Sequence, residues 1–207
     1  MTERYIVTGG AGFIGSHLAE RLLNDGHRVG IVDNLSTGKR ANLERLHGDL
    51  TFHEVSITDL DALRPIFAGV DTVFHQAALP SVPRSIDDPL TTHEYDLTGT
   101  LNVLIAARDS GGPRVIYAAS SSAYPEIDSE FKTQAISPRP LSPDGGPKPP
   151  PEYYCQTFTT VYGLETVCLR YFNVFGPQQD PTSQYAAVIP IFITQMLDRQ
   201  SPTIHGD

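Results

Sequence analysis

The 207-residue sequence contains no tryptophan, only two cysteines and no apolar run that approaches the length of a membrane span. Cys155 and Cys168 cannot form a disulfide framework and lack the spacing of metal ligands, and the seven histidines lack it too. No charged segment followed by an apolar one opens the chain, as a secretory leader would. We therefore expect a cytoplasmic protein with two buried or half-buried thiols, no metal site and no membrane anchor.

Positive charge is also scarce, since the sequence has 15 Lys and Arg but 24 Asp and Glu, which gives a net charge of -9. This balance argues against nucleic acid or an anionic membrane as a partner. The length allows one domain with a proper core and part of a second. A hydrophobic fraction of 40%, with 17 prolines and 17 glycines, predicts many loops around that core.

A glycine-rich segment near the start is the most informative part of the sequence. Gly9, Gly12 and Gly15 follow a short apolar run, 5–7, and open an apolar-periodic segment, 13–23. This order predicts a strand, a tight turn and a helix, in which the glycines let backbone amides approach a phosphate. The pyrophosphate of a dinucleotide would lie at the positive N-terminus of that helix.

The glycine turn is the first half of a dinucleotide-binding fingerprint, and the second half, an acidic residue after the next strand, is present as well. A second apolar strand, 28–32, ends in Asp33, whose carboxylate suits the ribose hydroxyls of NAD and repels the extra phosphate of NADP. The polar loop 34–38 that follows is rich in turn-forming residues. The alternative is an ordinary glycine turn in a fold that binds no nucleotide.

Strand-like runs alternate with helix-like ones along the chain, which predicts an α/β fold with a Rossmann-like, doubly wound parallel sheet. Further strands are expected at 50–55, 72–75, 115–118 and 165–169. A short helix is expected from Asp59, capped by Thr58, and a long helix over 89–108.

In such a sheet, ligands bind at the switch point between the first and fourth strands. The glycine turn should therefore lie beside residues 75–78. Ala77 and Ala78 are small enough to leave room for a cofactor there, although the alternative is that they merely pack. His75 is expected to be a structural hydrogen-bonder at the end of its strand.

Long motifs extend this pattern over nearly the whole chain, at residues 8–18, 33–38, 74–78, 81–85 with 88–89, 99–104, 119–124 and 169–177. With these motifs the sequence resembles the extended short-chain dehydrogenase/reductase group. Within that group it is most similar to the NAD-dependent nucleotide-sugar epimerases and dehydratases, and in particular to 4-epimerases of UDP-glucose or UDP-glucuronate. The resemblance implies NAD as cofactor and a UDP-sugar as the small-molecule partner.

The resemblance also implies a reaction. A tyrosine phenolate takes the proton of the sugar C4 hydroxyl while hydride moves to the nicotinamide. The resulting 4-keto sugar rotates in the site, so that it takes the hydride back on its other face. Ser120 matches the serine that hydrogen-bonds the reacting hydroxyl, and a lysine holds the ribose and lowers the tyrosine pKa through its positive charge.

The same resemblance assigns residues to the two ligands. Cofactor contacts fall on Gly9, Gly12, Phe13, Ile14, Gly15, Asp33, Asn34, Ser36, Thr37, Gly38, Ser56, Ile57, Gln76, Ala77, Ala78, Asp96, Ala118, Lys148 and Tyr171. Substrate contacts fall on Arg84, Ser85, Ser120, Ser122 and Asn173. The alternative for Arg84 is a solvated surface charge, and for Tyr171 a core aromatic at a strand end.

One motif departs from the family, which carries a tyrosine followed four residues later by a lysine at the start of a helix. Lys148 matches the lysine, but Asp144 replaces the tyrosine, and no tyrosine in this chain has a lysine four residues later. A model aspartate has a pKa of about 4 and is a feeble base with a shorter reach than a phenol. The alternative is rescue by Tyr124 or Tyr153, which the spacing does not support.

The surroundings of Lys148 have changed as well. Prolines at 147 and 149–151 predict a Pro/Gly-rich loop at about 137–151 and a helix from near Glu152, because an interior proline costs a helix about 3 kcal/mol. Ser56 and Asp96 stand where the family has aspartate and asparagine, and Pro125 stands where it has glycine. We expect these changes to weaken NAD binding without necessarily abolishing it.

The resemblance finally suggests how the chain is organised. We expect an NAD-binding Rossmann-like domain over 1–175 and the start of an incomplete substrate domain over 176–207. A homodimer is expected through helices over 97–108 and 152–162. Three hypotheses stay open: a 4-epimerase or a relative such as a nucleotide-sugar dehydratase, a non-catalytic binder of NAD or a nucleotide sugar, and a remnant with compromised folding.

Overall fold

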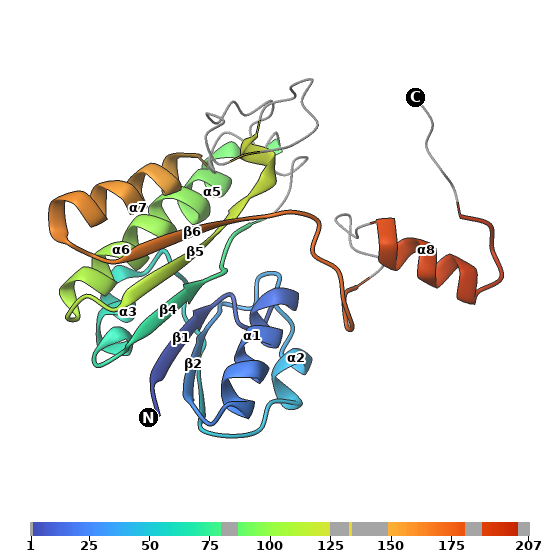
Figure 1. The fold of residues 1–207 in the computed structure, drawn as a ribbon, viewed down its shortest axis with the longest axis horizontal. Helices are drawn as coiled ribbons and strands as arrows, with labels where there is room; N and C mark the ends of the chain where they lie inside the picture. The colour runs from blue at the N-terminus through green and yellow to red at the C-terminus, as the bar shows by residue number, and fades with distance from the viewer. Residues whose placement is uncertain (1, 80–86, 125–132, 134–148, 181–187, 203–207) are drawn as a thin grey trace. The chain divides into compact units, whose positions relative to one another are not determined.

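A computed structural model describes residues 2–79, 87–124, 133, 149–180 and 188–202. The chain forms two compact units, Met1–Arg170 and Tyr171–Asp207. The first unit is built around a six-stranded sheet with the order β3-β2-β1-β4-β5-β6 (Figure 1). The strands are β1 (Arg4–Thr8), β2 (Arg28–Val32), β3 (Leu50–His53), β4 (Thr72–His75), β5 (Arg114–Ser120) and β6 (Thr166–Tyr171).

The strand order confirms the expected Rossmann-like, doubly wound sheet. β1 pairs in parallel with β2 on one side and with β4 on the other, and β3 and β5 continue the sheet outward in the same direction. The register places Thr8 at the end of β1 opposite His75 at the end of β4. The switch point, where a ligand binds such a sheet, therefore lies beyond these two residues.

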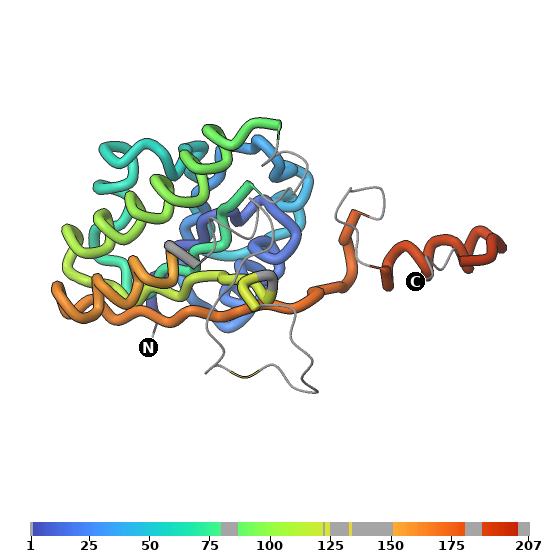
Figure 2. Tube along the Cα trace, turned by 90° about the horizontal axis from the view of Figure 1, so that it is seen from above, coloured from blue at the N-terminus to red at the C-terminus, as the bar shows by residue number. Residues whose placement is uncertain are grey.

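Helices cover both faces of the sheet (Figures 1 and 2). α1 (Phe13–Asn24) and α2 (Ala41–Glu44) lie on one face, and α3 (Leu60–Phe67), α6 (Thr100–Asp109) and α7 (Pro149–Tyr162) on the other. Because successive strand residues point to opposite faces, Ile6 is buried with residues of α3, α6 and α7, whereas its neighbour Val7 is buried with residues of α1. This two-sided burial accounts for the almost continuous apolar run of β1.

Helix α3 begins one residue later than expected and has a different cap. The carboxylate of Asp59 accepts the N–H of Ala62 at 3.0 Å, so Asp59 is the N-cap. The prediction of Thr58 as the cap was wrong, because its hydroxyl is hydrogen-bonded to the hydroxyl of Ser56 at 2.8 Å instead.

The single helix expected over 89–108 is divided into three parts. They are α5 (Pro89–His93), a π-helical turn η1 (Glu94–Gly99) and α6. A Cβ added to Gly99 would lie 2.5 Å from Cδ1 of Ile57, so the glycine lets this turn approach the segment after β3. The turn also keeps Asp96 buried, where Oδ1 accepts the N–H of Leu79 at 2.9 Å. Apolar periodicity does not reveal such long-range contacts, so the prediction of one regular helix was wrong.

Helix α7 begins at Pro149 rather than near Glu152. Prolines are compatible with the first turn of a helix, because the N–H groups of that turn have no partner within the helix in any case. Residues 149–151, which we assigned to the loop at about 137–151, therefore form helix. Pro151 is buried in this first turn.

The second unit, Tyr171–Asp207, contains one helix in its described part, α8 (Val188–Leu197). Its apolar side chains are largely exposed within this chain, with none of the helix residues buried. In the described ranges of both units, no helix combines the length and the apolar character needed to cross a membrane.

Candidate cofactor and substrate site

The glycine turn after β1 leaves no room for side chains. Gly9 adopts a φ of +68°, and a Cβ there would lie 2.7 Å from the amide nitrogen of Ala77. Gly15 lies in the first turn of α1, where a Cβ would come within 2.2 Å of the Gly9 carbonyl oxygen. The N–H of Gly12 donates to the same oxygen at 3.0 Å. The three glycines thus bring β1, α1 and the end of β4 into close contact, as their spacing predicted.

Asp33, the residue directly after β2, is held by two backbone amides. One carboxylate oxygen accepts the N–H of Ala11 at 3.0 Å and the other the N–H of Leu35 at 2.8 Å. The residue is only 9% exposed. An acidic group placed this way has a fixed orientation at the rim of the switch point.

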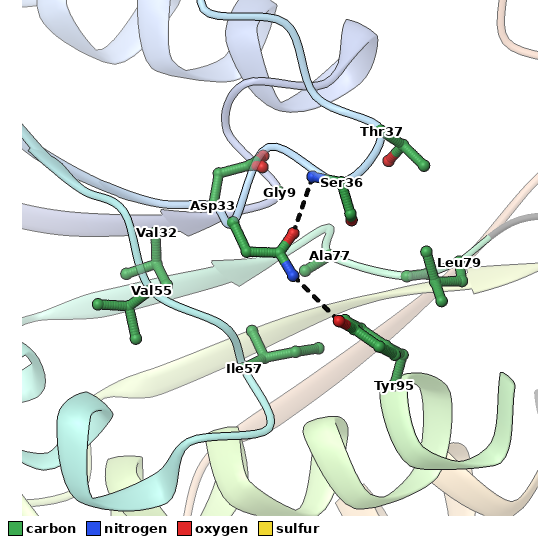
Figure 3. A pocket seen from close by; sticks show the side chains of 12 residues that line it. Gly9, Val32, Asp33, Ser36, Thr37, Val55, Ile57, Ala77, Leu79 and Tyr95 are labelled. Atoms are coloured by element: carbon green, nitrogen blue, oxygen red, sulfur yellow. Dashed lines mark hydrogen bonds between the residues drawn. The ribbon is translucent and has the colours of Figure 1, made fainter. Parts of the chain in front are cut away.

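A cleft of about 350 Å³ lies beyond the carboxyl ends of the central strands (Figure 3). Asn34 lines it and is held by two hydrogen bonds: its side-chain oxygen accepts the N–H of Ser36 at 3.1 Å, and its amide nitrogen donates to the hydroxyl of Tyr95 at 3.2 Å. The lining residues are Gly9, Val32, Asp33, Asn34, Ser36, Thr37, Val55, Ile57, Ala77, Ala78, Leu79 and Tyr95.

Sequence reasoning assigned eight of these twelve residues to a cofactor and missed Val32, Val55, Leu79 and Tyr95. The first three end or follow strands of the sheet, so the rule that ligands lie beyond the carboxyl ends of strands could have found them. Tyr95 lies in η1, and nothing in the local sequence distinguishes it from a core aromatic.

Nine other expected cofactor residues of the first unit lie around the cleft rather than on its wall. Gly12, Phe13, Ile14 and Gly15 form the start of α1 and its cap. A Cβ added to Gly38 would lie within 2.9 Å of both carboxylate oxygens of Asp33. The remaining positions are Ser56 after β3, half-buried Gln76 after β4, buried Asp96 in η1 and half-buried Ala118 in β5.

Buried polar groups at the end of β4 form a hydrogen-bond network beneath the switch point. The Thr100 hydroxyl donates to the carbonyl of Asp96 at 2.7 Å, so it accepts from Nε2–H of His75 at 3.0 Å. Nδ1 of His75 then accepts from the hydroxyl of Thr8 at 2.7 Å, and the same Thr8 oxygen accepts the N–H of Ala77 at 3.3 Å. Complete burial lowers the pKa of His75 to about 4, so the ring is neutral. The structural role expected for His75 agrees with this network.

The candidate catalytic and substrate residues are described only in part. Ser120 is the half-buried last residue of β5, and Ser122 lies in the 3-10 turn Ser121–Ala123 directly after it. Asp144, Lys148, Arg84 and Ser85 lie outside the described residues. Tyr171 and the exposed Asn173 belong to the second unit. Among the described residues, the cofactor candidates therefore gather at one cleft.

A charged cluster that sequence reasoning missed joins β6 to the first turn of α7. Nε and Nη2 of Arg170 donate to the carboxylate of Glu152 at 2.9 and 2.8 Å, and the guanidinium lies 4.7 Å from the ring centroid of Tyr124. The hydrogen bonds to Glu152 raise the pKa of Arg170. The pair fixes the helix that follows Lys148 against the strand that precedes Asn173.

Comparison with known proteins identifies the family. The model of the NAD dependent epimerase/dehydratase family matches residues 5–207. This chain belongs to that family. NAD is accordingly its cofactor, as the glycine turn and Asp33 predicted.

Individual relatives include proteins of several related activities. A putative UDP-glucose 4-epimerase of Methanocaldococcus jannaschii is 38% identical over 98% of this chain and 66% of its own. A UDP-glucuronic acid decarboxylase 1 of Xenopus tropicalis is 33% identical over 99% of this chain and 48% of its own. The chain thus spans about half to two thirds of the length of these relatives.

Solved structures of family members are also similar. A UDP-N-acetylglucosamine 4-epimerase from Methanobrevibacter ruminantium is 42% identical, with a TM-score of 0.93 over 100% of this chain and 67% of its own. The UDP-glucose 4-epimerase of Thermus thermophilus, solved in complex with NAD, is 37% identical, with a TM-score of 0.84 over 95% of this chain and 63% of its own.

The geometry of this chain fits the cofactor of its family. In the described first turn of α1 there is no acidic residue, and no side chain caps the helix, so its N–H groups are available to a pyrophosphate. A side chain at Gly9 or Gly15 would occupy space next to this turn. The fixed carboxylate of Asp33 lines the cleft where the ribose of the dinucleotide would lie.

Proposed function

We propose that this chain acts in UDP-sugar 4-epimerisation and binds NAD together with a UDP-sugar. The cleft at the switch point, with Asp33 and the glycine turn in hydrogen-bonded contact, is the observation that carries the proposal. The relatives named as 4-epimerases support this activity over that of the decarboxylase relative, because they are 38% and 42% identical to this chain and the decarboxylase is 33% identical.

Ser120 is the candidate for the group that hydrogen-bonds the reacting sugar hydroxyl. It ends β5, the neighbour of β4 in the sheet, so its position is at the same edge of the sheet as the cleft. NAD, when bound, supplies a hydride acceptor for the sugar C4 and returns the hydride. Lys148 is the candidate for the cation that holds the cofactor ribose, and Asn173 for a contact to the substrate.

A second candidate function is binding without turnover, and Asp144 favours it. The family uses a phenolate as the base that removes the proton of the sugar hydroxyl. A carboxylate with a pKa of about 4 is a much weaker base for this step. All described elements of the cofactor cleft are retained in this chain. Such a protein would bind NAD and a nucleotide sugar and leave the sugar unchanged.

The proposed assembly is a homodimer through the segments 97–108 and 152–162. Within the first unit, α7 exposes Tyr153, Val161 and Tyr162, at 53%, 63% and 53% of their surface. A second copy of the chain could bury these side chains. Light scattering at several protein concentrations tests this assembly, and a mass that stays at one chain throughout would contradict it.

The decisive experiment combines binding and turnover. The purified chain is titrated with NAD by calorimetry, then incubated with NAD and a panel of UDP-sugars, and the sugar nucleotides are separated by chromatography. An epimer or a 4-keto product supports the epimerase and names the substrate. Binding of NAD without any product supports the non-catalytic binder, and absence of NAD binding contradicts both.

A further inference from the structure

Helix α7 and strand β6 are joined by a regular series of side-chain pairs. At one end, Glu152 of α7 accepts three hydrogen bonds from Arg170 of β6, at 2.9, 3.2 and 2.8 Å. At the other end, the hydroxyl of Thr159 is hydrogen-bonded to that of Thr166 at 2.8 Å. Positions 152, 155 and 159 share one face of a helix, and positions 166, 168 and 170 share one face of a strand.

The middle of this series holds the two cysteines of the chain. Cys155 and Cys168 stand at the middle positions of this series, and Cys168 packs against the hydrophobic cluster that contains Cys155. The carbonyl of Cys155 also accepts from the hydroxyl of Thr166 at 3.1 Å, which keeps the helix in register with the strand. The pairs on both sides are bonded, so the position of the two sulfurs follows from the geometry of the whole helix–strand contact.

The two thiols differ in access and in acidity. Cys155 is completely buried, whereas Cys168 is half-buried. The hydrogen bond from Cys155 lowers the pKa of Cys168, while the same bond, followed by burial, raises the pKa of Cys155. The thiolate is the form of cysteine that reacts with oxidants.

We propose that Cys155 and Cys168 form a redox pair, in which a peroxide oxidises Cys168 and Cys155 closes a disulfide between α7 and β6. This inference goes beyond the proposed function and does not depend on it. The geometry assigns Cys168 as the attacking thiol and Cys155 as the resolving thiol.

Both steps balance with hydrogen peroxide as the oxidant. The Cys168 thiolate attacks one peroxide oxygen, the O–O bond breaks, and a sulfenic acid and hydroxide form. The Cys155 sulfur then attacks the sulfenic sulfur, the S–S bond forms, and the hydroxyl leaves as water with the proton of Cys155. The two cysteines lose two electrons in total, and the peroxide is reduced to two molecules of water.

The disulfide would cross-link two elements that flank candidate site residues. The first turn of α7 follows Lys148 directly in the sequence, and β6 leads to Asn173. Cross-linking them removes conformational freedom from the unfolded chain, so the oxidised protein should melt at a higher temperature. Reduction by a dithiol should reverse the change, as is usual for disulfides with a sensing role.

The test uses the full chain. Freshly reduced protein is treated with increasing hydrogen peroxide, and remaining thiols are alkylated with a maleimide after denaturation. Intact mass spectrometry should show both thiols lost together, with a mass decrease of two hydrogen atoms, and dithiothreitol should restore both. Two thiols that stay alkylatable, oxygen addition to Cys168 in place of the mass decrease, or a disulfide between two chains would overturn the proposal.

Two variants separate the roles of the cysteines. In Cys155→Ser, the sulfenic acid at Cys168 has no resolving partner and should be trapped by dimedone. In Cys168→Ser, the remaining Cys155 should stay reduced at the same peroxide concentrations, because it is buried and has lost its partner. Reaction of Cys155 in the second variant at the wild-type rate would contradict the assignment. The wild-type measurement decides the proposal even where a variant does not fold.

Discussion

One carboxylate oxygen of Asp33 accepts the backbone N–H of Ala11 at 3.0 Å, so the residue that follows β2 is bonded to the glycine turn that follows β1. The other oxygen accepts the N–H of Leu35. The two halves of the dinucleotide fingerprint are therefore one hydrogen-bonded unit. Asp33 has a structural role in this unit in addition to its position on the wall of the cleft.

Replacing Asp33 with asparagine should separate these two roles. Asp33→Asn exchanges one acceptor oxygen for an NH₂ group, which leaves one backbone N–H without a partner, at a cost of about 1–3 kcal/mol in the free energy of unfolding. The affinity for NAD should fall more than that for NADP, because the charge that repels the extra phosphate is lost. Urea unfolding and titration with both cofactors measure the two effects. Equal loss of affinity for both would contradict the role in cofactor choice.

Gly9→Ala should abolish NAD binding and destabilise the fold, because it adds a collision at 2.7 Å to a backbone with positive φ. Gly26→Ala is the matched control, since Gly26 also has a positive φ, +83°, but no atom lies within 4 Å of its Cβ position. The control should cost only the conformational strain of about 1–2 kcal/mol and keep NAD affinity. Thermal unfolding and NAD titration compare the two, and equal behaviour would show that the close approach to Ala77 is unimportant.

The buried His75 should make stability depend on pH. Its folded pKa of about 4 lies below the ordinary value of 6.5, so the unfolded state binds more protons between these values. Stability should be fully present above about pH 6.5 and fall toward pH 4, by roughly 3 kcal/mol from this group. His75→Gln should flatten this part of the pH profile measured by urea unfolding. The exposed His47→Gln should leave the profile unchanged, and an unchanged profile in both would refute the assignment.

The pair formed by Glu152 and Arg170 should be strongly coupled. Their side chains are 7% and 16% exposed, and removing one partner of such a buried pair typically costs about 3–5 kcal/mol. A double-mutant cycle with Glu152→Gln and Arg170→Met measures the coupling by chemical unfolding. The exposed pair of Arg21 in α1 and Asp25 at its C-cap is the control, for which about 0.2–1 kcal/mol is expected. Similar coupling for both pairs would rule out a special role for Glu152 and Arg170.

Restoring the tyrosine of the family should restore turnover. Asp144→Tyr returns a phenol four residues before Lys148, and a positioned base contributes roughly a hundredfold or more to the rate. Asp144→Phe is the control, because it adds the ring without the hydroxyl. Chromatography of the UDP-sugar products compares the three proteins. A gain in both variants, or in neither, would mean that the missing phenol does not limit the reaction.

Local signals in the sequence were sufficient for the sheet and for most of the residues that line the cleft at the switch point. The glycine spacing and Asp33 predict the switch point because their roles depend on backbone geometry within a few residues of the turn. The apolar runs predict the strands because parallel strands are buried on both faces. Each of the six expected strands is present, with ends shifted by up to two residues.

The remaining features depend on contacts between distant parts of the chain. Tyr95 enters the cleft because η1 is pressed against the segment after β3, and Gly99 makes this approach possible. Arg170 and Glu152 are separated by 18 residues in the sequence and meet only when α7 packs on β6. No periodicity or short motif encodes such pairs, so sequence reasoning could not identify them.

The central place of β1 in the sheet has a consequence for synthesis of the protein. β1 is synthesised before both of its neighbours in the sheet, and the second of them, β4, lies 67 residues further along the chain where His75 meets Thr8. Until β4 emerges, a nascent chain that has paired β1 with β2 presents an open strand edge, which can pair with another chain. Chaperone protection should therefore matter most during translation of the segment between β2 and β4.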